Sequence, residues 1–178
     1  MGRKYLTKGQ SMDILEKAGE IETKGEQLYR DMAEKSPVTE IKSIFGFLAG
    51  EEKRHYEALQ AMRKHTMLPA IEKSSILSDS KAVFKNLSEQ FTAPGTIAID
   101  REFALNTALE FENKSVSIYD KAIAELIMAP ENEGSRRVLK QIAEQEKDHV
   151  LLIKSLMDFQ RHPYEWLENA EWNHLDEY

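Results

Sequence analysis

Two Glu-x-x-His motifs of this sequence, Glu52 to His55 and Glu146 to His149, are each preceded by a Glu-x6-Tyr motif. Glu112 follows Glu22 by 90 residues, and Glu146 follows Glu52 by 94 residues. The residues of the two copies correspond one to one: Glu22, Tyr29, Glu52 and His55 in the first, and Glu112, Tyr119, Glu146 and His149 in the second. The similar offsets indicate that one two-helix unit is repeated, with its acid and imidazole positions retained.

Four long stretches of the chain carry apolar residues at the 3.6-residue period of an α-helix, and no stretch alternates with the period of a strand. This pattern predicts an all-α four-helix bundle made of two helical hairpins. Ser36 and Pro37 are expected as the N-cap and the first-turn proline of the second helix. Residues 65–95 are long enough to cross the bundle between the hairpins, and they contain a predicted short helix around Phe84. The bundle helices are expected at about 11–35, 37–64, 100–129 (from 96 at the earliest) and 135–160.

The length of 178 residues fits a single domain. We expect this domain to span residues 1–178, with the bundle at about 11–160 and a short helical tail at 161–178. The tail holds both tryptophans, Trp166 and Trp172, which indicates that it packs against other protein surface. It either covers its own bundle or helps to form a dimer contact, and we expect a homodimer or a larger homo-oligomer.

The composition argues against several classes of function. The net charge of −7 and the lack of a long basic run argue against nucleic-acid binding. The absence of cysteine excludes disulfides, thiolate metal sites and a cysteine nucleophile. The sequence has no apolar run long enough to span a membrane and no apolar signal core, so we expect no membrane association and a cytoplasmic location.

Each Glu-x-x-His motif places its two side chains on one face of a helix, where they can hold one metal ion. Apolar residues at helical spacing flank Glu52 and Glu146, and they also flank Glu22 and Glu112, so all four glutamates are expected to point inward. Their distances from the interhelical turns are similar, which predicts that they lie at one level of the bundle. Four buried carboxylates would repel one another, and two metal cations are the simplest way to neutralise them.

Two helices that each supply a Glu, combined with two that each supply Glu-x-x-His, resemble the ferritin-like di-iron carboxylate bundles. Within that group the chain is similar to the rubrerythrin-type proteins over residues 11–160. The likeness lies in the segments AGEIETKGEQLY, LAGEEKRHYEAL, ALEFENKSVSIY and IAEQEKDHV. The resemblance therefore implies a ferritin-like four-helix bundle.

The resemblance also implies a ligand set for two metal ions. Oxygen ligands with two imidazoles suit iron, and manganese or zinc are alternatives. The implied ligands are Glu52 and Glu146 as bridging, catalytic carboxylates, Glu22 with His55 on one ion, and Glu112 with His149 on the other.

As a function, the resemblance implies a di-iron oxidoreductase that reduces peroxide or oxygen. Full-length rubrerythrins carry a tetracysteine iron centre through which electrons enter, and this chain has no cysteine, so a separate electron-donor protein is expected. Peroxide-reducing rubrerythrins also carry a carboxylate one turn beyond a helix ligand, where this chain has Ser115. Two other functions stay open: a ferroxidase that handles iron, and a structural module stabilised by metal.

Several neighbouring residues are assigned supporting roles. Tyr29 and Tyr119 are interpreted as buried aromatics whose hydroxyls hydrogen-bond ligand carboxylates. The acids assigned to solvated helix faces are Glu51, Glu57, Glu102 and Glu144. The methionines assigned to the bundle core are Met62, Met67, Met128 and Met157.

Overall fold

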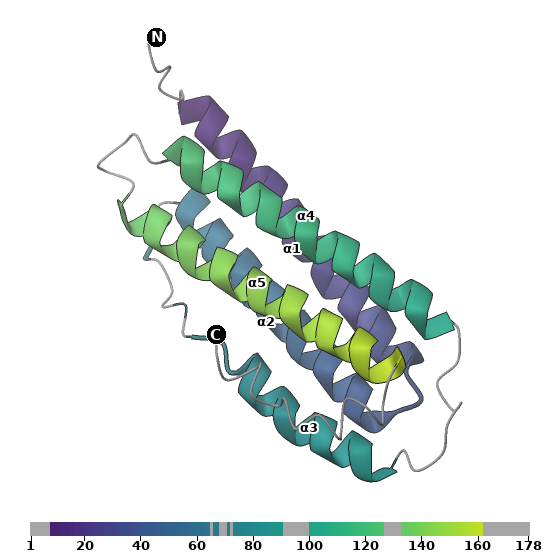
Figure 1. Ribbon diagram of the computed structural model, residues 1–178. Coiled ribbons are helices and arrows are strands. Elements are labelled where there is room, and N and C mark those ends of the chain that lie inside the picture. The colour runs from purple at the N-terminus through teal and green to yellow at the C-terminus, as the bar shows by residue number, and fades with distance from the viewer. Residues whose placement is uncertain are drawn as a thin grey trace.

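A computed structural model of the chain describes residues 8–64, 66–67, 71, 73–90, 100–126 and 133–161. The helices α1 and α2 form one hairpin and α4 and α5 the other, with α1 also packed on α4 and α2 on α5 (Figure 1). This arrangement confirms the predicted all-α bundle of two hairpins. The described residues contain the helices α1 (Lys8–Lys35), α2 (Thr39–Arg63), α3 (Ile76–Gln90), α4 (Asp100–Leu126) and α5 (Glu133–Arg161).

The predicted short helix in the crossover is α3, which lies on the outside of the bundle against α2 and α5 (Figure 1). Its side chains Ile76 and Phe84 are buried. The ring of Phe84 meets the ring of Phe159 on α5 edge to face, with their centroids 5.8 Å apart. These apolar contacts fix α3 against the bundle, because an aromatic pair of this geometry adds to the hydrophobic gain from burial.

The turn between α1 and α2 differs from the prediction. The helix α2 begins at Thr39, and Val38 precedes it with an extended backbone (φ −102°, ψ 117°) and no side-chain cap. Ser36 lies earlier, in the turn, where its hydroxyl accepts a hydrogen bond from the Val38 amide at 3.4 Å. The assignment of Ser36 and Pro37 as N-cap and first-turn residues was therefore wrong, because these residues are used to reverse the chain between two antiparallel helices.

Among the described residues, the buried apolar side chains form two clusters at different levels of the bundle. One contains Tyr29 together with Ile44, Leu48, Ile153 and Leu156. The other surrounds Tyr119 and includes the side chains Ala58, Leu59, Leu139 and Ile142. Buried polar residues lie on the same helices between these clusters, so apolar layers close the polar centre on both sides.

Two of the methionines assigned to the core, Met62 and Met157, are buried. Met67 is 93% exposed, so its assignment to the core was wrong. It lies beyond Arg63, the last residue of α2, and outside the described helices. Met128 lies outside the described residues.

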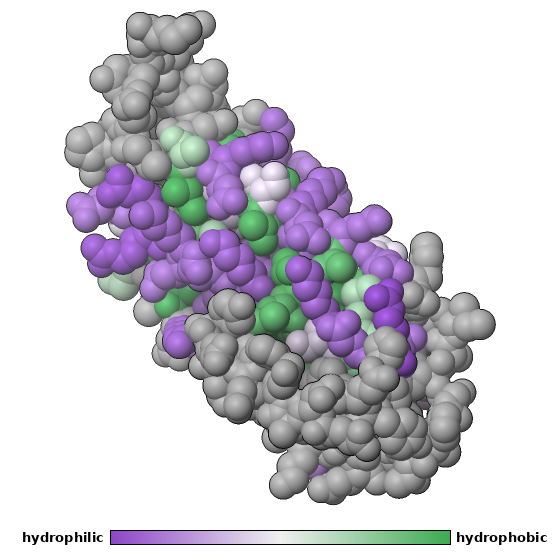
Figure 2. All heavy atoms as spheres, in the orientation of Figure 1, coloured by the Kyte–Doolittle hydropathy of each residue, from purple (hydrophilic) through white to green (hydrophobic). Residues whose placement is uncertain are grey.

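The outer face of the bundle is mostly hydrophilic over α4 and α5, with hydrophobic side chains along the line where the two helices meet (Figure 2). None of the described helices is both long enough and apolar enough to cross a membrane. Arg161, the first residue of the predicted tail, ends α5, and the rest of the tail, with Trp166 and Trp172, lies outside the described residues.

Candidate metal centre

The six side chains singled out by the duplicated motifs meet inside the bundle, and each is fully buried. They form two groups, and within each group one ligand atom per residue lies within 4.8 Å of the others. Glu52 and Glu146 belong to both groups. The groups are Glu22, Glu52, His55 and Glu146, and Glu52, Glu112, Glu146 and His149. The structure thus contains two adjoining sets of carboxylate and imidazole atoms that share a pair of glutamates.

Both histidines turn the same ring nitrogen toward the carboxylates. In His55, Nδ1 lies 2.8 Å from Glu146 Oε1 and 3.3 Å from Glu22 Oε2. In His149, Nδ1 lies 3.2 Å from Glu52 Oε1 and 3.6 Å from Glu112 Oε2. In each histidine, Nδ1 is therefore the atom placed to bind a metal.

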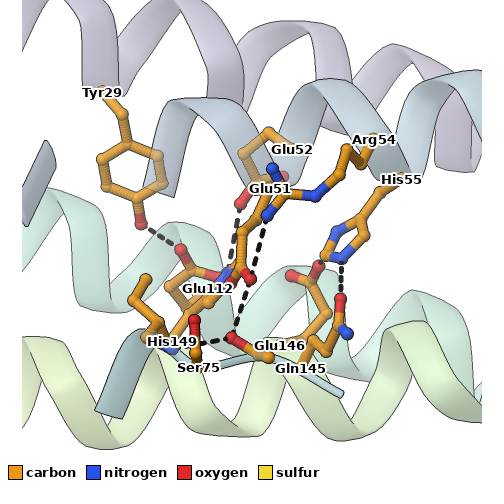
Figure 3. Close-up of polar contacts among 12 residues, drawn as sticks. Tyr29, Glu51, Glu52, Arg54, His55, Ser75, Glu112, Gln145, Glu146 and His149 are labelled. Atoms are coloured by element: carbon orange, nitrogen blue, oxygen red, sulfur yellow. Dashed lines mark hydrogen bonds and ion pairs between the residues drawn. The ribbon is translucent and has the colours of Figure 1, made fainter. Parts of the chain in front are cut away.

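Two tyrosines divide the carboxylates into two kinds. The Tyr29 hydroxyl on α1 donates to Glu112 Oε1 on α4, and the Tyr119 hydroxyl on α4 donates to Glu22 Oε1 on α1 (Figure 3 shows the first pair). Glu22 and Glu112 therefore each keep one carboxylate oxygen without a hydrogen-bond partner. Glu52 and Glu146 have no hydrogen bond on either oxygen, and Oε1 of each lies within ion-pair distance of a histidine Nδ1.

The unpaired atoms provide a test of whether this centre fits a metal. Buried polar atoms without partners are rare in folded proteins because each one costs free energy. Here they converge: both oxygens of Glu52 and Glu146, Oε2 of Glu22 and Glu112, and Nδ1 of both histidines lack hydrogen-bond partners. Oxygen and imidazole nitrogen are the donors that iron and manganese take. The residues present therefore fit two cations.

The electrostatics of the metal-free cluster also indicate a site for cations. Burial raises the pKa of Glu52 well above its usual value, and the charges of Glu146 and Glu22 raise it further. Burial and Glu22 raise the pKa of Glu146 to about 7. Burial would lower the pKa of His55, but its contacts with Glu146 and Glu22 outweigh this and raise it to about 10. Without metal, the cluster holds protons where cations fit.

The sequence matches the rubrerythrin family over residues 13–157, which includes all six of these side chains. The chain belongs to the rubrerythrin family. Comparison with curated proteins and with solved structures gave no match. Family membership and the two buried groups together establish a ferritin-like bundle with a carboxylate site able to bind two metals.

Glu51 is a residue of this rubrerythrin-family site that sequence reasoning missed. It was assigned to a solvated face, and the structure shows it 5% exposed, with Oε2 at 2.8 Å from His149 Nε2. The assignment was wrong because α3 and the segment before it cover this side of α2. Ser74, just before α3, donates to Glu51 Oε1 at 2.7 Å. Of the other acids assigned to solvated faces, Glu57 and Glu144 are exposed, and the side chain of Glu102 is not described.

Gln145 takes the corresponding place in the second half of the chain. Its Oε1 lies 2.7 Å from His55 Nε2, and the side chain is 7% exposed. Glu51 and Gln145 each stand directly before a shared glutamate, Glu52 or Glu146. This position in the repeat was the sequence signal that could have identified both residues.

Ser115 departs from the pattern of peroxide-reducing rubrerythrins. It is fully buried one turn beyond Glu112 on α4, and its hydroxyl has no hydrogen-bond partner. The corresponding position on α1 is Gly25, one turn beyond Glu22. Neither helix therefore supplies a further carboxylate to the centre at this position.

Proposed function

We propose that this chain is a di-iron oxidoreductase that reduces peroxide, or oxygen, with electrons from a separate donor protein. The observation that carries the proposal is the convergence, in a fully buried centre, of carboxylate oxygens and imidazole nitrogens that lack hydrogen-bond partners. Membership of the rubrerythrin family supports iron as the metal.

The hydrogen bonds around the centre support a distinct role for each carboxylate. Glu52 and Glu146 have both oxygens available, so each can bridge two ions. Glu22 and Glu112 have one oxygen engaged by a tyrosine, so each offers a single oxygen to one ion. We therefore assign Glu52 and Glu146 as the bridges, Glu22 and His55 as ligands of one ion, and Glu112 and His149 as ligands of the other.

Reduction of hydrogen peroxide to two water molecules takes two electrons and two protons. Two bound ferrous ions would supply one electron each and would polarise the bound oxygen atoms. The protein contributes a site closed to bulk water, because all six proposed ligands are fully buried. Tyr29 and Tyr119 hold the two terminal carboxylates in place, and burial raises the pKa of each phenol, so both keep the proton that they donate.

The electrons for the proposed di-iron centre are assigned to a separate donor, because these residues cannot form a thiolate-bound iron centre. A thiolate-bound iron centre needs cysteine, and the 178 residues contain none. A soluble reductant or a reduced electron-carrier protein must therefore reload the centre after each turnover.

The test is turnover of the iron-loaded protein. Protein prepared without oxygen and loaded with Fe(II) is mixed with hydrogen peroxide and a supplied reductant, and peroxide consumption is followed. We expect two iron ions per chain and sustained consumption. His149→Ala should lose at least one ion and most of the rate, whereas Glu57→Gln, at an exposed position on α2, should change neither.

Other outcomes would identify the other candidate functions. Growth of an iron mineral under excess Fe(II), without turnover of peroxide or oxygen by the supplied reductant, would show a ferroxidase. Two bound ions with neither reaction would show a structural metal site. Either result would contradict the oxidoreductase proposal.

A further inference from the structure

Each histidine of the centre makes a second contact across the bundle with the residue that precedes a proposed bridge. His149 on α5 meets Glu51 on α2, and His55 on α2 meets Gln145 on α5, both through Nε2 (Figure 3). A histidine that donates its Nε2 proton keeps the Nδ1 lone pair for a metal. Both contacts thus orient a ligand, and the repeat places them at corresponding positions.

The two contacts differ in charge. Glu51 brings a carboxylate to His149, whereas Gln145 brings a neutral amide oxygen to His55. Glu51 is also held firmly, because its Oε1 accepts from Ser74 at 2.7 Å and from Arg54 at 3.1 Å. A carboxylate partner makes an imidazole a stronger donor to metal than an amide partner does, because it stabilises positive charge on the ring.

The two groups are otherwise alike in their ligand types. Each group has three glutamates and one histidine, and two of those glutamates are shared. Each unshared glutamate accepts from one buried tyrosine. The pair Glu51 and Gln145 therefore supplies a difference in charge between two positions with matching ligand chemistry.

We propose that Glu51 and Gln145 are positioning residues that make the two metal positions unequal, so that the position of Glu112 and His149 fills first and binds more tightly. The inference rests on the proposed di-metal centre. Replacement of a residue that supports a metal ligand typically changes affinity about 10- to 100-fold, which sets the expected difference between the two positions.

The test uses Co(II) alone as the probe, because it takes the same kinds of ligand and gives both an absorption spectrum and anomalous X-ray scattering. The metal-free full chain is titrated with Co(II), and crystals loaded with one equivalent are used to measure the occupancy of each position. The wild-type protein should show two affinities about 10- to 100-fold apart, with the cobalt mainly beside His149.

Variants that move the carboxylate from position 51 to position 145 decide whether Glu51 and Gln145 cause the difference between the two metal positions. Glu51→Gln should bring the two affinities together by weakening the tighter one. The exchange variant, Glu51→Gln with Gln145→Glu, should reverse the order, so that the position of His55 fills first. Glu57→Gln removes an exposed carboxylate from the same helix and should leave the order unchanged. A residue that only holds the fold together would not reverse the order when the charge is exchanged.

The outcomes separate this inference from the proposed function. Equal occupancy in the wild type, or an unchanged order in the exchange variant, would overturn the inference and leave a two-metal centre standing. No bound Co(II) in the wild type would overturn both. If the exchange variant does not fold, the single variant Gln145→Glu provides the test. It should raise the Co(II) affinity of the weaker position, that of His55. An unchanged ratio between the two affinities would contradict the inference.

Discussion

Gly25 shows how a single residue shapes the centre. A Cβ built at this position of α1 would lie 2.8 Å from the Phe111 ring and 3.0 Å from the Glu52 carboxylate. The absence of a side chain lets α1 approach a proposed bridging ligand closely. Gly46 on α2 is the contrasting case, because a Cβ there would meet nothing within 4 Å.

We predict that Gly25→Ala displaces Glu52, weakens metal binding and destabilises the protein by about 1–3 kcal/mol, the usual cost of overpacking. The helix propensity of alanine offsets this by about 1 kcal/mol at most. Gly46→Ala should gain stability instead. Calorimetric titration with Fe(II) or Mn(II), together with urea unfolding of both variants, checks this. Metal affinity in Gly25→Ala equal to that of Gly46→Ala would contradict the packing argument.

At the scale of the elements, α3 links the crossover to the centre. The buried ring of Phe84 docks α3 on α5 through Phe159. The segment just before α3 supplies Ser74, whose hydroxyl holds Glu51. The crossover thus does more than connect the hairpins, because it helps to fix a group that contacts a proposed ligand.

We predict that Phe84→Ala lowers the free energy of unfolding by about 3–5 kcal/mol, as expected for loss of a buried aromatic ring. The variant should also raise amide hydrogen exchange along α3 and around Ser74. Phe47→Ala is the matched control, because Phe47 is 46% exposed and its loss should cost far less. Equal destabilisation of the two variants would mean that α3 is not docked through Phe84.

For the molecule as a whole, the buried acids and histidines couple folding to pH when metal is absent. The pKa of Glu146 is raised to about 7 in the folded state. This group therefore contributes stability that is present when the pH lies below its pKa in the unfolded state, and that is lost as pH rises through 7. The raised pKa of His55, about 10, gives stability that is lost as pH rises through 10. Glu51, with a pKa lowered to about 2, adds stability above its unfolded value and loses it as pH falls through 2.

We therefore predict that the metal-free protein is most stable near about pH 5 and becomes less stable as pH rises to 9. Urea unfolding at pH 5, 7 and 9 in the presence of a chelator measures this. A metal-free protein that grew more stable over this range would show that the carboxylates are not packed together in the folded state.

The same reasoning predicts that the double variant Glu52→Gln with Glu146→Gln melts at a higher temperature than the wild type when both are metal-free at neutral pH. Two neutral amides replace two acids that resist ionisation in the fold. At a free metal concentration one hundred times the dissociation constant, metal should stabilise the wild type by about 2.7 kcal/mol. It should stabilise the double variant by much less. Thermal melts of the wild type and the double variant, each with and without Mn(II), measure both the metal-free melting temperature and its rise on metal binding. A variant that melts lower and still gains as much from metal would exclude both glutamates as ligands.

The sequence by itself determined the helical class, the two hairpins and the identity of the residues that meet in the centre. Helical period and the repeat were sufficient for this, because residues three or four apart on a helix share a face whatever the rest of the chain does. The repeat then marked four glutamates as one inward-facing set, and the structure places them in two adjoining buried groups that share two of them. The four are Glu22, Glu52, Glu112 and Glu146.

Only the tertiary structure decided how the neighbouring residues pair with that set. Glu51 reads as a solvated acid in its own helix, and it is buried because α3 and the segment with Ser74 cover it. The pairing of Tyr29 with Glu112, and of Tyr119 with Glu22, crosses between the hairpins. Such contacts depend on how whole helices pack against one another, and the pattern along a single helix carries no information about its partner.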